Sequence, residues 1–128
     1  MSLDGNARPR LQALSDHLME LHRAVVQATR TVYEVGHGAI SATAFLHLLT
    51  EDPAYVWLKS FTRLVLELDI ALDGKAPLAL ERWPEWQARI IALLDRDEAF
   101  VEHYAELLQS DPEVGGLHAQ LRMLLSAN

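Results

Sequence analysis

His22 is the residue of this chain best placed to take part in chemistry. It belongs to a column of polar residues, Ser15, His22 and Thr29, that recurs every seven positions. Apolar residues flank this column on both sides at helical spacing, so one long helix would carry it into a dry interior. Because buried polar groups are normally hydrogen-bonded for stability alone, we expect the imidazole to bind a hydroxyl or a carbonyl. A ligand-binding histidine is the alternative interpretation.

Asp97 is the second candidate, because it falls within the apolar stripe of residues 84–110. In a continuous helix its carboxylate would be costly unless it were paired, and His22 is the candidate partner. Such a pair would raise the pKa of the histidine and lower that of the aspartate. The rival arrangement is a helix break at this point, with Asp95 as the cap and Glu98 completing a capping box. The pattern favours the continuous helix.

If the candidate side chains lie close together in one helical bundle, they could form a small-molecule binding site. Ligand pockets combine apolar walls with a few polar groups that fix orientation. Aromatic walls would come from Trp57 or Phe61. The candidate ligand-binding residues are His22, Thr29, Tyr33 and Asp97.

Metal binding is the enzyme-like alternative, and residue spacing argues against it. A ferritin-like di-iron site needs two Glu-x-x-His motifs on inward faces, whereas only Glu34 and His37 match, at a helix end beside glycine. No two histidines are four apart, as haemerythrin-like sites usually require. The chain has no cysteine, which excludes thiolate nucleophiles and zinc knuckles. We therefore expect no metal, no cofactor and no catalytic residue.

Composition and net charge indicate which classes of binding partner are unfavourable for this chain. Half of the 128 residues are hydrophobic, which suits a single domain, and the formal net charge is −7. That charge repels phosphate backbones and anionic lipid, so nucleic acid and membranes are poor partners. No apolar run approaches the ~18–20 residues of a membrane helix, and residues 1–10 lack the core of a secretory signal. We expect a cytoplasmic protein.

The elements that would position these residues are helices. The first is predicted over residues 11–35, and Gly36-His37-Gly38 ends it. Eight apolar residues alternate there at three- and four-residue spacings and form an apolar seam that other helices must cover: Leu11, Leu14, Leu18, Leu21, Val25, Ala28, Val32 and Val35. Residues 75–82 are expected to form at most one loose turn, and residues 1–6 to be disordered or added in cloning. The other predicted helices span residues 42–50, 53–73, 84–110 and 112 onward, with capping at Ser41 and at two Asp-Pro pairs.

The predicted helix over residues 53–73 is apolar on two sides. Its core stripe runs from Trp57 to Leu72, and Val56, Leu66 and Ile70 lie away from that stripe. A helix of this kind is either sandwiched within its own domain or buried in a subunit contact. The final helix or a homodimer would supply the cover.

Packing and capping residues along the chain also resemble those of a known family. The markers are Leu21-His22-Arg23, Tyr33-Glu34, His37-Gly38, Ile40-Ser41, Asp52-Pro53, Trp57-Leu58, Tyr104, Asp111-Pro112 and His118-Ala119. In these residues the chain resembles a family of small uncharacterised all-helical proteins of proteobacteria. The resemblance implies a single-domain, cytosolic, all-helical protein and no particular activity.

The sequence thus predicts an all-α, up-and-down helical bundle of four main helices plus one short helix, forming one domain over residues 1–128. We expect a non-enzymatic interaction or regulatory protein that self-associates as a homodimer. A bundle that binds a small apolar ligand around His22 is the alternative, and a metal-dependent bundle enzyme is a further one.

Overall fold

The computed structural model describes residues 8–74 and 82–126, and these form helices without any strand. The expectations for residues 1–6 and 75–81 lie outside the described residues. The α-helices are α1 (Arg8–His37), α2 (Ala42–Glu51), α3 (Lys59–Asp73), α4 (Arg82–Arg96), α5 (Glu98–Ser110) and α6 (Pro112–Ser126), and a 3-10 helix, η1 (Pro53–Leu58), precedes α3. The all-helical prediction is confirmed.

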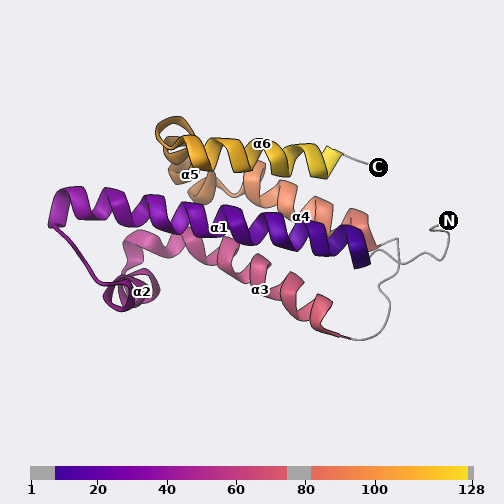
Figure 1. Ribbon diagram of the computed structural model, residues 1–128, viewed down its shortest axis with the longest axis horizontal. Helices are drawn as coiled ribbons and strands as arrows, with labels where there is room; N and C mark the ends of the chain where they lie inside the picture. The colour runs from indigo at the N-terminus through magenta and orange to yellow at the C-terminus, as the bar shows by residue number, and fades with distance from the viewer. Residues whose placement is uncertain (1–7, 75–81, 127–128) are drawn as a thin grey trace.

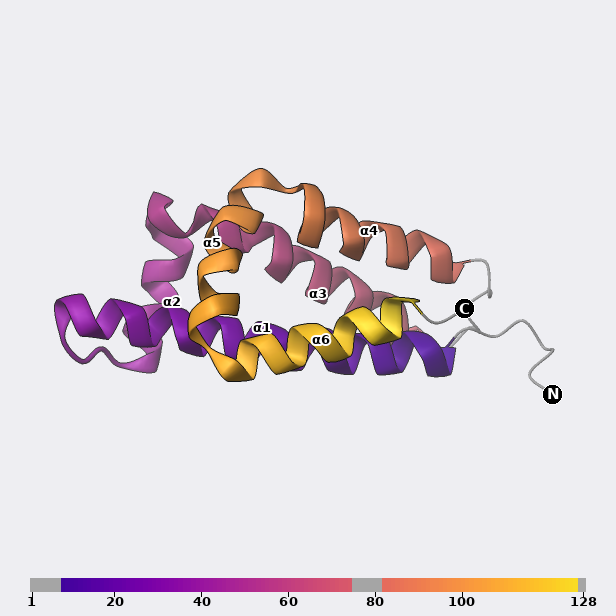
Figure 2. The same cartoon turned by 90° about the horizontal axis from the view of Figure 1, so that it is seen from above.

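The helices fall into two sets by direction. α1 runs through the length of the molecule, with α3 along one side and α6 along another (Figure 1). α4 packs against α3 and α5. Along the long axis, α1, α3, α4 and α6 alternate in direction, whereas α2 and α5 lie across that axis (Figure 2).

The predicted apolar seam of α1 is buried over most of its length. Leu11, Leu14, Leu18, Leu21, Val25 and Ala28 all lie in the core. The two last seam residues do not, because Val32 is 63% exposed and Val35 is 86% exposed. The prediction was wrong for these two valines. Heptad spacing defines which side of a helix is apolar, but the length of the neighbouring helices decides how far that side is covered.

Side chains cap three elements near the predicted positions. Ser41 accepts a hydrogen bond from the Ala44 amide at 3.1 Å and begins α2. Asp52 and Asp111 each precede a proline and accept from amides two residues on, at 2.9 Å. Capping by short polar side chains satisfies amides that lack helical partners. The first six residues of the predicted 53–73 helix nevertheless form η1 rather than α-helix.

The predicted continuous helix over residues 84–110 is broken at Asp97. α4 ends at Arg96, and Asp97 adopts an extended backbone as the N-cap of α5. Its carboxylate accepts a hydrogen bond from the Phe100 amide at 3.2 Å. The slight preference for continuity was therefore wrong. A carboxylate within an apolar stripe is cheaper as a cap at a break than as a charge in a continuous helix. The cap is Asp97, not the Asp95 considered in the rival arrangement.

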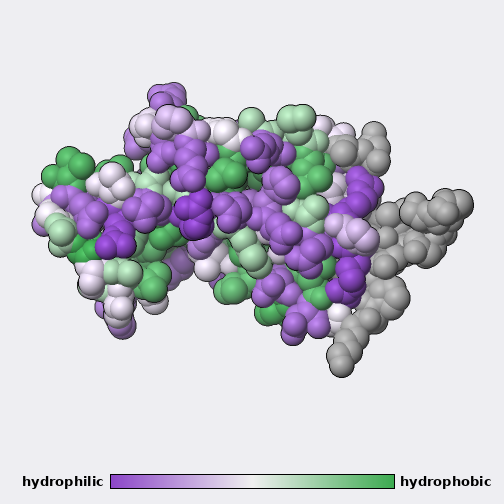
Figure 3. Space-filling model, viewed as in Figure 1, coloured by the Kyte–Doolittle hydropathy of each residue, from purple (hydrophilic) through white to green (hydrophobic). Residues whose placement is uncertain are grey.

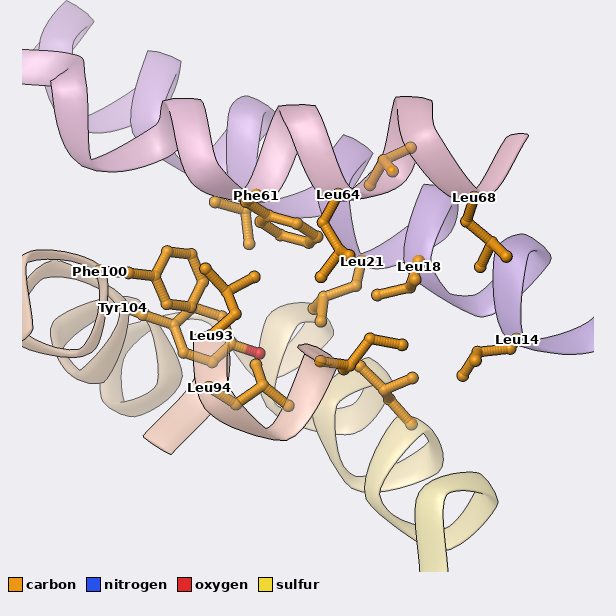
Figure 4. Close-up of a cluster of buried hydrophobic side chains, with 14 of the residues drawn as sticks. Leu14, Leu18, Leu21, Phe61, Leu64, Leu68, Leu93, Leu94, Phe100 and Tyr104 are labelled. Atoms are coloured by element: carbon orange, nitrogen blue, oxygen red, sulfur yellow. The ribbon is translucent and has the colours of Figure 1, made fainter. Parts of the chain in front are cut away.

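The core is formed by residues of α1, η1, α3, α4, α5 and α6, with an aromatic cluster at its centre. Phe61 of α3 meets Phe100 of α5 edge to face, with ring centroids 5.5 Å apart, and Tyr104 stacks on Phe100 at 4.7 Å. Figure 4 shows α1, α3, α4 and α5 contributing inward-pointing side chains to this cluster, namely Leu14, Leu18, Leu21, Phe61, Leu64, Leu68, Leu93, Leu94, Phe100 and Tyr104. Burial of these apolar groups is the main stabilising contribution to the fold.

Candidate functional site

His22 lies half-buried between α1 and α3. Its Nε2 atom is 2.9 Å from the hydroxyl oxygen of Thr62, and its ring meets Phe61 edge to face at 5.0 Å. Burial lowers the pKa of His22, because removal from water penalises the charged imidazolium. The hydroxyl partner agrees with the expected structural histidine. The ring is partly accessible, so the prediction that the whole polar column is buried holds for Ser15 and Thr29 only.

The four candidate ligand residues do not share one site. His22 lines a hollow of about 450 Å³ between α1, α2 and α3. Thr29 and Tyr33 line a second hollow, of about 400 Å³, and Asp97 lines a third, of about 390 Å³. Asp97 caps α5 and His22 bonds Thr62, so the hypothetical His22–Asp97 pair is not formed. Of the proposed aromatic walls, Trp57 belongs to the second hollow and Phe61 to the core.

The hollow beside His22 opens onto an apolar surface. Its walls include Val26 of α1, Leu46 and Leu49 of α2, and Leu66 of α3. Leu66 is 54% exposed and Ile70, one turn further along α3, is 71% exposed. Apolar surface over α3 is visible among hydrophilic side chains in Figure 3. The second apolar side of this helix is thus open to solvent, and α6 packs against α1 and α5 instead of covering it.

We define the α3 outer face as the stripe opposite the core, with spacings of three and four residues. Its members are Lys59, Thr62, Arg63, Leu66, Asp69, Ile70 and Asp73. The two basic residues lie in the first half and the two acidic residues in the second half. Within the described chain, none of these four charges forms an ion pair. The positions of the stripe are symmetric about Leu66, and the charges on the two sides are opposite. Arg63 and Asp69 lie three positions before and after Leu66, and Lys59 and Asp73 lie seven positions before and after it.

The second hollow, called the aromatic hollow below, lies between the end of α1, η1 and α5. Two imidazole rings stack on aromatic rings there: His37 on Tyr33, with centroids 4.3 Å apart, and His103 on Trp57, at 4.9 Å. Tyr55 and Glu106 also line the hollow. The pKa of Tyr55 is raised by burial, with smaller contributions from Asp52 and Tyr33. Sequence reasoning missed the α5 residues of this hollow, because His103 and Glu106 lie some 70 positions from Tyr33 and share no motif with it.

A polar network ties α4, α5 and α6 together. Arg122 forms an ion pair with Asp95 and donates a hydrogen bond from Nε to Nε2 of His118 at 3.4 Å. Because Nε2 accepts, Nδ1 of the neutral ring carries the hydrogen and donates to the Tyr104 hydroxyl at 2.8 Å. Burial lowers the pKa of His118, and the Arg122 cation lowers it further. The pKa of Tyr104 is raised by burial. The network is structural, since every member is bonded to another.

Two further possibilities concern metals and membranes. Across residues 8–74 and 82–126, no three His, Asp or Glu side chains gather closely enough to hold a metal ion. The metal-dependent alternative therefore has no donor set in this part of the molecule. None of the helices described here has the length and hydropathy needed to cross a membrane.

In comparisons with protein-family models, with curated proteins and with solved structures, the chain has no match. The resemblance to small all-helical proteins of proteobacteria therefore stays a prediction.

Proposed function

We propose that the protein is a non-enzymatic interaction module of the cytosol, which self-associates through the α3 outer face. The alternating directions of its four long helices support an up-and-down four-helix bundle as the architecture of this module. The two-fold symmetry of the α3 outer face about Leu66 is the observation that carries the proposal.

Antiparallel packing of two copies of α3 converts that symmetry into contacts. In a closed dimer the same surface meets itself, so a residue before the axis faces its counterpart after the axis. With the axis at Leu66, Arg63 faces Asp69 of the second copy, Lys59 faces Asp73, and the two Leu66 side chains meet. The charges that have no ion-pair partner within the described chain then acquire one across the interface.

The hollow beside His22 completes the interface. Thr62 lies opposite Ile70 of the second copy in this register, and Thr62 lines the hollow together with Val26 and Leu49. The largely exposed Ile70 side chain would therefore enter an apolar recess instead of meeting a flat surface. Two faces of this length cover roughly 1,000 Å² in total, which corresponds to a weak and reversible dimer.

Substitution of Leu66 by glutamate tests the proposal. L66E places two carboxylates on the two-fold axis, so sedimentation velocity should show a concentration-dependent dimer for the wild-type chain and a monomer for the variant. Met123→Glu is the matched control, because Met123 lies on α6 and is 74% exposed. Circular dichroism should report the same helix content for all three proteins. A wild-type chain that stays monomeric up to about 500 μM, or an L66E variant that dimerises like M123E, contradicts the proposal.

A further inference from the structure

We propose that the aromatic hollow binds a small organic cation with an alkylated ammonium head group. Its volume of about 400 Å³ lies within the range of small-molecule pockets. It shares no lining residue with the hollow beside His22 and includes no residue of the α3 outer face. The inference is therefore independent of self-association.

The walls of the aromatic hollow attract positive charge. The rings of Tyr33, Tyr55 and Trp57 line it, with His37 stacked on one face of Tyr33 and His103 on one face of Trp57. The negative quadrupole of an aromatic face attracts cations, and alkylammonium groups above all. Glu106 supplies a full negative charge, and no ion pair within the described residues neutralises it. None of the described lining residues is Lys or Arg. An anion would therefore find no cationic lysine or arginine among these residues and would be repelled by Glu106.

Each imidazole ring of the hollow has one nitrogen held by the backbone of its own helix. Nδ1 of His37 lies 3.1 Å from the backbone oxygen of Tyr33, and Nδ1 of His103 lies 2.9 Å from that of Ala99. A carbonyl oxygen can only accept, so each Nδ1 carries a hydrogen, and Nε2 is the nitrogen of each ring that can act as an acceptor. Besides the aromatic rings, the acceptors that the lining can offer a cation are these two nitrogens and the Glu106 carboxylate.

The shape of the site suits a head group with apolar substituents rather than a bare ion. His37 and His103 each cover only one face of the ring they stack on, and Val32, Ala54 and Leu107 supply apolar walls. No cluster of three ligating side chains is present among the described residues, so a metal ion lacks the donor set it needs. Methylated or otherwise alkylated ammonium groups combine the charge with the apolar surface that this hollow accepts.

Choline chloride and its uncharged carbon isostere, dimethylbutanol, are the probes. Titration of choline into the ¹⁵N-labelled protein should shift the indole N–H resonance of Trp57, with a dissociation constant on the order of 1 mM. The indole resonances of Trp83 and Trp86, which lie outside the hollow, should not move. The isostere should bind at least about tenfold more weakly, because it lacks the charge that the rings and Glu106 attract.

Substitutions in and near the aromatic hollow test whether its carboxylate contributes to choline binding. Glu106→Gln should weaken choline binding about tenfold, whereas Glu102→Gln, exposed one turn earlier on α5 and outside the hollow, should not change it. Val32→Glu adds a second carboxylate at the rim and should tighten binding several-fold. The proposal is overturned if Trp57 does not respond to choline, if the isostere binds equally well, or if E106Q and E102Q behave alike.

Discussion

Charge reversal on the α3 outer face gives the sharpest test of the dimer geometry. In the antiparallel register about Leu66, Arg63 of each copy faces Asp69 of the other, so the contact occurs twice. Arg63→Asp replaces both attractions by repulsions, and Asp69→Arg does the same with the opposite sign. Each variant alone should therefore lose the dimer, and an equimolar mixture should regain it, because the mixed pair restores two opposite-charge contacts.

The size of the effect follows from the exposure of these groups. A partly exposed ion pair contributes about 0.5 kcal/mol, and a like-charge contact opposes association by a similar amount. Over two contacts, reversal weakens the dimer by about 2 kcal/mol, or about 30-fold in the dissociation constant. Since salt screens exposed charges, the loss should shrink between 0.05 and 1 M NaCl, over which the Debye length falls from above ~10 Å to ~3 Å.

Sedimentation velocity on the separate and mixed variants is the assay. R63D and D69R should each sediment as monomers at concentrations where the wild-type chain is dimeric, and their mixture should sediment as a dimer. The double variant R63D/D69R, which restores opposite charges within one chain type, should dimerise by itself. A mixture that remains monomeric beside a dimeric wild type would refute this register, even if self-association itself is correct.

Two further predictions concern the stability of the monomer. The pKa values of His22 and His118 are lowered in the folded chain, chiefly by burial. The unfolded chain therefore binds more protons than the folded chain below about pH 6.5. As a result, the free energy of unfolding is highest above that pH and decreases as the pH falls toward 5.5. Urea unfolding at pH 7.5 and 5.5 should show this loss, H22Q should reduce it, and greater stability at pH 5.5 would contradict it. Asp97→Ala removes the cap that binds the Phe100 amide and should cost about 1 kcal/mol in thermal or urea unfolding, whereas D97N should retain most of the stability. Equal stability of D97A and D97N would be the contrary result.

The inner side of each helix was predictable because periodicity reports burial directly. Every apolar residue assigned to the core stripe of the 53–73 helix, from Trp57 to Leu72, is buried. The apolar residues at helical spacing within residues 84–110 are also buried, although the break between α4 and α5 was not predicted: Trp86, Ile90, Leu93, Phe100, Tyr104 and Leu107. The stripe continues across Asp97 from Leu93 to Phe100, so hydrophobic spacing is the same for a continuous helix and for two helices that turn at a cap.

The site was less predictable because it depends on how helices are placed relative to one another. His22 and Thr29 lie in the same column of α1, and spacing alone placed them in one site. η1 and α5 pack near Thr29, whereas α2 and α3 pack near His22, so the two residues line different hollows. The symmetry of the α3 outer face, in contrast, is a property of the sequence itself and was open to sequence reasoning.

The charge order of that face is also unfavourable for α3 by itself. The partial charges of a helix favour acidic residues in its first turn and basic residues in its last turn, by about 0.3–1 kcal/mol each. The α3 outer face has the opposite order, with Lys59 in the first turn and Asp73 in the last turn. In an antiparallel pair, each cationic end lies beside the carboxyl end of the other helix, where positive charge is favourable. Antiparallel pairing with a second copy of this chain therefore offsets, in both copies, the unfavourable interaction between these charges and the ends of their own helix.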